Sequence, residues 1–345
     1  MKIEVYSPTI RRKEMVAVLT AMVENKIGPG EQSKILIQAA REKIKFDYCL
    51  ALRSPAIALS LALKALSLEK GQGVIISALS PMYYAHVLED MGLIPVYCDV
   101  LPSSACIGLE TIEKARSSVK KDLDVRCIII HHTLGLIPDR AAIAELGLPL
   151  IEDCSQSFGT AINDEVMPTF TILGLEEKDM LTSGGGALLY SGSRRDSALL
   201  RNISAPMADL PPEYGLPDMN AALAVVQFRE ISKNLLKRSE IASLYVQSAM
   251  KTRNKRFVQS DPEYNNYVFP LILETGMNEV KSYAKRKDIA VENAFENTLA
   301  ANSMVKRDEC PEACSLSLRT VLFPLYPRLG MKGALKVSKI IQTLP

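Results

Sequence analysis

The apolar residues at the start of this chain follow helical spacing. In residues 11–25 they recur every three or four positions, as on one face of a helix. These positions are Met15, Val16, Leu19, Met22 and Val23. A Gly-Pro-Gly turn follows at 28–30, and a second helical segment runs to about residue 44. The chain therefore begins with two predicted helices.

From about residue 52, short apolar runs alternate with helical stretches of about ten residues. The predicted strands cover 73–77, 94–100, 126–132, 149–153, 169–175 and 186–190. The predicted helices cover 52–66, 83–92, 109–120 and 139–146. This alternation predicts an α/β fold with a mainly parallel sheet and helices on both of its faces.

The pattern changes after a Pro-rich loop at 206–218, where a long helical region covers 221–250. A strand at 266–274 and helices at 278–288 and 333–344 follow it. A chain of 345 residues is long for a single core. We therefore expect a large domain, 1–235, and a small C-terminal domain, 236–345, joined by the long helix.

Composition narrows the class of protein. A net charge of +2 does not favour nucleic-acid binding, and the N-terminus lacks the apolar stretch of a signal peptide. Apolar runs fall short of the roughly 20 residues that span a membrane. The seven cysteines show no disulfide spacing, and Cys310 and Cys314 have no accompanying His that would favour a zinc site. A cytoplasmic protein with reduced thiols and no metal is expected.

Two predicted strand ends carry residues suited to cofactor chemistry, because ligands of open α/β sheets bind at the carboxyl ends of strands. The strand at 149–153 ends in Glu152 and Asp153, with Gln156 close behind. A carboxylate there can pair with a protonated ring nitrogen, or it can simply cap the next turn. The next strand is expected to end at Lys178, where an amine can form a Schiff base with a carbonyl. The alternative is a solvated loop lysine.

Two further segments could contact a ligand. Ser54 is a good N-cap and Pro55 suits the first helical position, so this helix start could bind an anion, with charge added by Arg53. The alternative is a well-capped buried helix. His131 and His132 stand at a strand end, where packing or cofactor contact is favoured over metal binding.

Eight segments, in this order, resemble the DegT/DnrJ/StrS family of pyridoxal phosphate (PLP)-dependent sugar aminotransferases over nearly the whole chain. They are KIGPGEQSKILIQAA, SPAIALSLALKAL, GVIISALSPMYYAHVLEDMGLIPVYCDV, HHTLG, IEDCSQSFG, KDMLTSGGGALL, YGLPDMNAALAVVQF and CPEACSLSLRTVLFPLYPRL. The resemblance implies the aspartate aminotransferase-like fold of PLP-dependent transferases, with a small α+β C-terminal domain.

The resemblance also implies chemistry. It implies PLP bound covalently to Lys178, with Asp153 at the pyridine nitrogen and Gln156 near the ring hydroxyl. It implies a cytoplasmic homodimer that aminates a nucleotide-linked keto-sugar for polysaccharide biosynthesis, with glutamate or glutamine as the amino donor. The expected cofactor contacts are Ser54, Ala56, Arg53, Tyr83, Tyr84 and His132.

Several positions depart from the family pattern, mostly where that pattern binds the cofactor phosphate. They are Pro55 and Ala56 for Gly-Thr, Leu173 for Ser, Pro81 for the stacking aromatic, Gly184 for Glu, and Glu213 and Gly215 for a partner-subunit Asn and Arg. Tyr83 and Tyr84 lie close enough to Pro81 to replace the aromatic. Three functions stay open: an aminotransferase, a PLP-dependent sugar dehydratase, or a cofactor-poor relative that serves as a binding or partner subunit.

Overall fold

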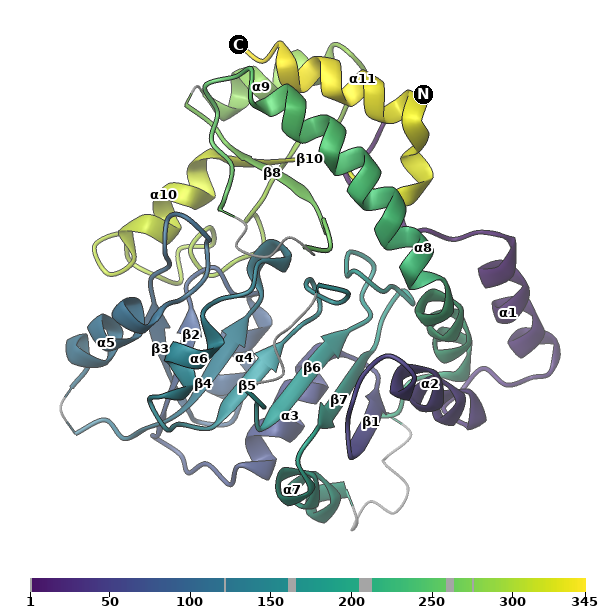
Figure 1. The fold of residues 1–345 in the computed structure, drawn as a ribbon. Helices are drawn as coiled ribbons and strands as arrows, with labels where there is room; N and C mark the ends of the chain where they lie inside the picture. Colours follow the sequence, from purple (N-terminus) through teal and green to yellow (C-terminus); the bar gives the residue numbers. More distant parts are fainter. Residues whose placement is uncertain (1, 121, 161–165, 205–212, 259–263, 275) are drawn as a thin grey trace.

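The structure is a computed structural model that describes residues 2–120, 122–160, 166–204, 213–258, 264–274 and 276–345. Residues 206–212 of the Pro-rich loop lie outside these ranges. A sheet flanked by helices forms the larger part of the molecule, and a smaller part lies across the end of one long helix (Figure 1). None of the helices in the described ranges has both the length and the hydrophobicity needed to cross a bilayer.

The central sheet has seven strands in the order β1-β7-β6-β5-β4-β2-β3. Their bounds are β1 Tyr48–Leu52, β2 Gly73–Ser77, β3 Ile94–Cys98, β4 Val125–His131, β5 Leu150–Asp153, β6 Phe170–Gly174 and β7 Ala187–Ser191. β7 runs antiparallel to both of its neighbours, and the pairs from β6 to β3 are parallel. The predicted α/β fold with a mainly parallel sheet is confirmed.

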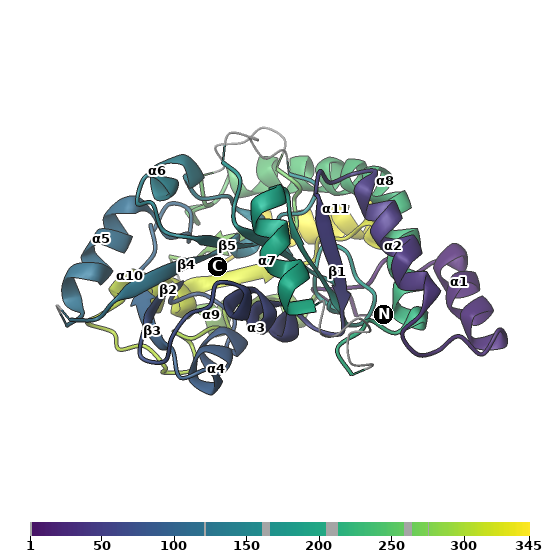
Figure 2. The same ribbon diagram turned by 90° about the horizontal axis from the view of Figure 1, so that it is seen from below.

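Helices cover both faces of this sheet, which explains the continuous apolar runs of its strands. α3 Pro55–Ala65 and α4 Tyr83–Asp90 lie on one face, and α5 Leu109–Ser118 and α6 Arg140–Ala144 lie on the other (Figure 2). Every residue of β2 and of β6 is buried. α7 Arg194–Ser204 follows β7, and a 3-10 turn at Thr133–Gly135 follows β4.

The long helix α8, Asp218–Ala249, connects two hydrophobic clusters. Its side chains up to Ile231 pack with the central sheet, whereas those from Ile241 onward pack with the small sheet. The boundary expected at residue 235 therefore falls inside one continuous helix. The helices α1 Arg12–Val23 and α2 Glu31–Arg41 pack against the first half of α8 (Figure 1).

The smaller part of the molecule contains an antiparallel sheet in the order β8-β10-β9. Its elements are β8 Phe269–Ile272, α9 Met277–Lys285, β9 Glu292–Asn293, α10 Pro311–Arg319, β10 Thr320–Phe323, a 3-10 turn at Pro327–Leu329 and α11 Gly330–Gln342. The N-terminus joins this part through a bridge between Ile3 and Ile289. We retain the division into two domains as a proposal.

Candidate functional site

The carboxyl ends of β4, β5 and β6 bring chemically active side chains to one edge of the central sheet. In the strand register, Asp153 of β5 lies between His131 of β4 and Ile172 of β6. Only 2% of Asp153 and 4% of His131 are exposed to solvent. Parallel pairing therefore places a buried carboxylate where open α/β sheets bind ligands.

Both oxygens of the Asp153 carboxylate already have hydrogen-bond donors from this chain. The hydroxyls of Tyr84 and Tyr83 donate to Oδ2 at 2.7 and 3.1 Å. The backbone N–H of Ser155 donates to Oδ1 at 2.9 Å, and the Ser155 hydroxyl donates to the same oxygen. A carboxylate has about four acceptor positions, so this one is saturated. Burial, and then the charge of Asp153, raise the pKa of both tyrosine hydroxyls.

His131 faces the same carboxylate without a direct hydrogen bond to it. Its Nδ1 lies 3.9 Å from Oδ2 of Asp153 and has no partner in the described part of the chain. Burial lowers the pKa of the imidazole, although the charge of Asp153 opposes this effect. The ring is therefore neutral at neutral pH, and it packs edge-on against Tyr84 with 6.1 Å between ring centroids.

His132 points to a different network from that of Asp153. Its Nδ1 contacts the Ser157 hydroxyl at 2.6 Å and its Nε2 contacts Oε1 of Glu152 at 3.1 Å. Arg140 holds the same carboxylate with two nitrogens. Despite burial, His132 and Arg140 together lower the pKa of Glu152. The His132 side chain therefore takes part in the buried network of Glu152 and Arg140, while its backbone N–H donates to the Asp153 carbonyl at 3.1 Å. Its contact with a cofactor stays a prediction.

The same network accounts for a group of possible metal ligands. Ligand atoms of His132, Glu152 and Cys154 lie within 4.8 Å of one another, and all three residues are buried. Arg140 already pairs with Glu152, so a cation would have to compete with a buried guanidinium. The group is explained by the ion pair, and we assign no metal to it.

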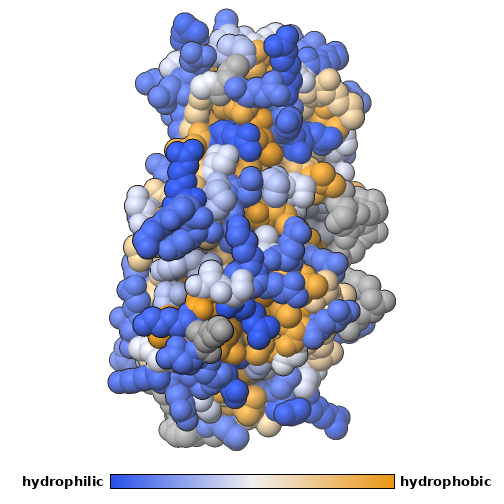
Figure 3. All heavy atoms as spheres, turned by 90° about the vertical axis from the view of Figure 1, so that its left-hand side faces the viewer, coloured by the Kyte–Doolittle hydropathy of each residue, from blue (hydrophilic) through white to orange (hydrophobic). Residues whose placement is uncertain are grey.

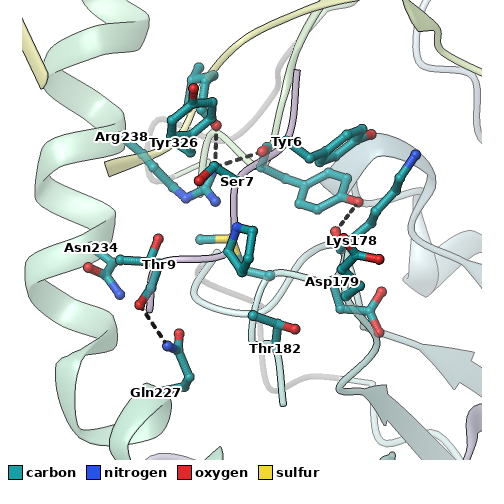
Figure 4. Close-up of a pocket in the computed structure, with 15 residues that line it drawn as sticks. Tyr6, Ser7, Thr9, Lys178, Asp179, Thr182, Gln227, Asn234, Arg238 and Tyr326 are labelled. Atoms are coloured by element: carbon teal, nitrogen blue, oxygen red, sulfur yellow. Dashed lines mark hydrogen bonds between the residues drawn. The ribbon is translucent and has the colours of Figure 1, made fainter. Parts of the chain in front are cut away.

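Lys178 lies in the loop after β6, and the prediction that the strand ends at this residue is wrong. The strand ends at Gly174, and a turn follows in which the Glu176 N–H donates to the Asp179 carboxylate at 2.8 Å. The Lys178 side chain is 52% exposed and its Nζ lies 3.3 Å from Oε2 of Glu292. Nζ also lies 4.8 Å from the centroid of the Tyr6 ring, which the side chain passes in Figure 4.

A small cavity lies beside Lys178, between the loop after β6 and helix α8. Lys178 and Asp179 line one side, and Arg238 and Asn234 of α8 line the other (Figure 4). Its volume is about 30 Å³. A water molecule needs roughly 10–15 Å³ by the same measure, and ligand pockets span about 300–1,000 Å³. The cavity has room for water but not for an organic cofactor.

Asp179 differs from its neighbours because its carboxyl is partly buried. Burial raises its pKa to about 7, and the charges of Asp153 and Glu176 add to this effect against the hydrogen bond from the Glu176 N–H. In the unfolded chain the group loses its proton near pH 4. The folded state therefore binds more protons between these values, and stability falls as the pH rises toward about 7.

We expect Asp179→Asn to remove this pH dependence, because an amide oxygen can still accept the Glu176 N–H. At pH 8 the free energy of unfolding of the variant should exceed that of the wild type by about 1–2 kcal/mol. This is less than the whole pKa shift of Asp179 would give, because the side chain is partly exposed. Urea unfolding across pH 4–8 measures the difference, with exposed Glu177→Gln as the control. If the difference in unfolding free energy between the variant and the wild type does not change with pH, the raised pKa of Asp179 is contradicted.

The start of α3 offers little to a phosphate group. The Ser54 hydroxyl accepts the Ile57 N–H at 3.3 Å, as its predicted N-cap role requires, and Pro55 has no N–H. Among the first three helical amides, Ala56 alone keeps an N–H for an anion. The nearby Arg53 side chain is exposed.

The remaining expected site residues have other partners. Gln156 accepts the Leu134 N–H on its side-chain oxygen at 2.7 Å, which fixes the turn after β4. Gly215 pairs with Leu52 beside the start of α3, and Glu213 is exposed. Sequence patterns gave no sign of the roles of Glu292 and Tyr6, which meet Lys178 only through the fold.

In this arrangement the residues do not fit PLP. The carboxylate expected at the ring nitrogen has no acceptor position left, and Asp153 is not among the residues that line the small cavity at Lys178. The helix start expected at the phosphate has lost an amide donor at Pro55. Binding of the cofactor requires a different arrangement of Tyr83 and Tyr84.

Comparisons with known proteins give the family. The family model described as the DegT/DnrJ/EryC1/StrS aminotransferase family matches residues 8–342. An L-glutamine:2-deoxy-scyllo-inosose aminotransferase from Streptomyces lividus is 26% identical over 70% of this chain and 59% of its own length. The chain thus spans less than two thirds of that relative. A GDP-perosamine synthase from Vibrio cholerae is 22% identical over 84% of each chain.

Solved structures show the same fold. A protein from Streptococcus pneumoniae assigned as a sugar aminotransferase, in its PMP form, has a TM-score of 0.87 and 16% identity over 100% of this chain and 98% of its own. A GDP-4-keto-6-deoxymannose-3-dehydratase has a TM-score of 0.84 and 14% identity over 99% of each chain. The predicted aspartate aminotransferase-like fold is confirmed.

The family model covers nearly the whole chain, so the predicted resemblance is confirmed. Family members are aminotransferases that use PLP, and the expected enzyme class and cofactor are confirmed at that level. The chain belongs to the DegT/DnrJ/EryC1/StrS aminotransferase family.

Proposed function

We propose that this chain is a PLP-dependent aminotransferase that moves an amino group from glutamate or glutamine to a ketone on a hydroxylated ring. The activities of three relatives support the substrate class. They act on 2-deoxy-scyllo-inosose, form GDP-perosamine, or aminate dTDP-4-dehydro-2,3,6-trideoxy-D-glucose. A nucleotide-linked keto-sugar is the first substrate to test, and a keto-cyclitol is the second.

One observation carries the proposal: the chain keeps a buried carboxylate, Asp153, at the end of β5, together with Lys178 in the loop after β6. A buried acid suits a protonated pyridine nitrogen, and PLP so held would act as an electron sink. The exposed half of the Lys178 side chain leaves its amine accessible to a carbonyl compound. Glu292 pairs with that amine at 3.3 Å.

The test uses purified protein incubated with PLP. A visible absorbance band that borohydride bleaches is expected, and glutamate should convert the cofactor to its PMP form with release of 2-oxoglutarate. A keto-sugar that loses a hydroxyl group instead of gaining an amino group would favour the dehydratase, a function of one structural neighbour that is itself trapped with a PLP-glutamate adduct. A protein that never takes up PLP would contradict both enzymatic functions.

A second candidate function is a cofactor-free binding or partner subunit. The observation that favours it is the saturated Asp153 carboxylate, together with Pro55 at the start of α3. Such a protein would bind a family substrate or a family subunit without turning it over. Calorimetry with a nucleotide-sugar and no PLP would detect this activity.

We also propose that the chain forms a homodimer through α1. Residues on one side of this helix expose large apolar side chains, with 49–81% of each accessible to solvent. They are Met15, Val16, Leu19, Met22 and Val23. The far side of the molecule carries apolar patches broken up by polar side chains (Figure 3). A continuous apolar helix face of this kind favours a protein partner.

Replacing both Leu19 and Val23 with Glu should convert the dimer to a monomer, because the charges would have to be buried without partners. Light scattering coupled to gel filtration measures the mass, and circular dichroism checks the fold. Met250→Glu, at the end of α8 and 72% exposed, is the matched control. An unchanged mass for the double variant would show that α1 is not the interface.

A cytoplasmic location is the remaining proposal. All seven cysteines are free and buried, which suits a reducing compartment.

A further inference from the structure

The first turn of α4 inserts two aromatic side chains into the site of the proposed reaction. Tyr84 has no exposed surface, and its ring packs edge-on against Tyr83 with centroids 4.9 Å apart. Both hydroxyls meet on Oδ2 of Asp153, about 70 residues away along the chain. Asp153 is also the residue expected to hold the ring nitrogen of PLP.

We propose that Tyr83 and Tyr84 compete with the cofactor ring for the Asp153 carboxylate, so that the two tyrosines and the ring exclude each other. This inference takes its ligand from the proposed function. Oδ1 accepts two bonds from Ser155, which belongs to the turn after β5 and cannot withdraw without moving the strand end. Oδ2 is therefore the oxygen that can be released, and Tyr83 and Tyr84 are the groups that must release it.

The local structure allows this exchange. α4 is only 8 residues long and begins without a side-chain cap. The Tyr84 N–H donates to the Pro81 carbonyl at 3.1 Å, and the two hydroxyl bonds to Asp153 are the side-chain hydrogen bonds that hold this first turn among the described residues. Turning this segment outward would free Oδ2 and would remove two rings from the space in front of it. His131, whose buried Nδ1 has no partner among the described residues, would stay beside the carboxylate.

If the tyrosines compete with the cofactor, Tyr84→Phe should change stability and PLP affinity in opposite directions. Tyr84→Phe removes the shorter bond to Asp153 and keeps the ring, so it should lower the stability of the cofactor-free protein. The same change should tighten PLP binding about tenfold, since a hydrogen bond to a charged group need no longer be broken. Tyr84→Thr also removes the ring and should speed PLP association by tenfold or more.

The experiment measures three quantities for each variant: the PLP dissociation constant, the association rate by stopped-flow absorbance, and the urea midpoint without PLP. Tyr245→Phe is the control, because it deletes a buried tyrosine hydroxyl that donates to Pro324 in the small domain. The control should lower the midpoint without changing PLP binding. If Tyr84 had a merely structural role, replacing it would lower stability and weaken PLP binding together.

Three outcomes would overturn the competition. PLP could bind wild type and both variants with equal rate and affinity, or a PLP-soaked crystal could retain both tyrosine bonds to Asp153. Failure of the wild type and of Tyr84→Thr alike to take up PLP would show that the tyrosines are not the barrier. Repeating the titration in a Lys178→Ala background separates this question from the proposed function, because ring binding at Asp153 does not need the amine.

Discussion

Replacing Lys178 with alanine should abolish amino transfer and leave the protein folded. The amine is the candidate nucleophile, and loss of such a group costs on the order of a thousandfold or more in rate. Its partner is Glu292, in an ion pair whose side chains are 52% and 36% exposed. Exposed pairs contribute about 0–1 kcal/mol, so the urea midpoint should barely move.

The measurement is glutamate-dependent formation of 2-oxoglutarate in the presence of PLP and a keto-sugar acceptor. Glu292→Gln is the matched variant, because it removes the ion pair and keeps the amine. It should retain most of the activity. A Lys178→Ala protein as active as the wild type would refute the assigned role, and equal losses in both variants would assign the effect to the ion pair.

Replacing Arg140 with leucine should cause the largest loss of stability that we predict. The guanidinium pairs with the buried Glu152 and donates to the Val166 carbonyl at 2.7 Å. Its removal leaves the His132 ring as the side-chain contact of Glu152 among the described residues, and Glu152 is only 2% exposed. Breaking one side of a buried ion pair costs about 3–5 kcal/mol.

Urea unfolding followed by circular dichroism measures the loss. The double change Arg140→Leu with Glu152→Leu should recover most of the stability, since no uncompensated charge remains. A single variant that loses less than about 1 kcal/mol would show that water or a neighbouring group compensates Glu152. It would also reopen the question of whether His132, Glu152 and Cys154 can hold a cation.

The central sheet was predictable because its inner strands are apolar over most of their length. The predicted strand at 73–77 matches β2, Gly73–Ser77, and every residue of it is buried. The strand β1, Tyr48–Leu52, was missed because the apolar pattern there continues into α3, and the strand pairs only at the edge with β7. The elements α10 and β10 were missed because they follow each other without a break.

The candidate site was predictable only in its residue types. The carboxylate at 153 follows from its place at a strand end, and the structure confirms that it ends β5. The strand was expected to reach Lys178, but a turn at 176–179 intervenes, held by a hydrogen bond from a backbone N–H to the Asp179 carboxylate. The pattern of hydrophobic residues does not reveal such a hydrogen bond.

By itself, the sequence determined the layered α/β architecture, the order of its main elements and the family. Strands buried on both faces of a parallel sheet are continuous apolar runs, and such runs are recognised from neighbouring residues alone. Only the tertiary structure decided which groups meet at Asp153 and at Lys178. Tyr84 reaches Asp153 across 69 positions of the chain, and Glu292 reaches Lys178 across 114. Contacts between side chains so far apart depend on how helices and loops pack, and spacing along the chain does not encode them.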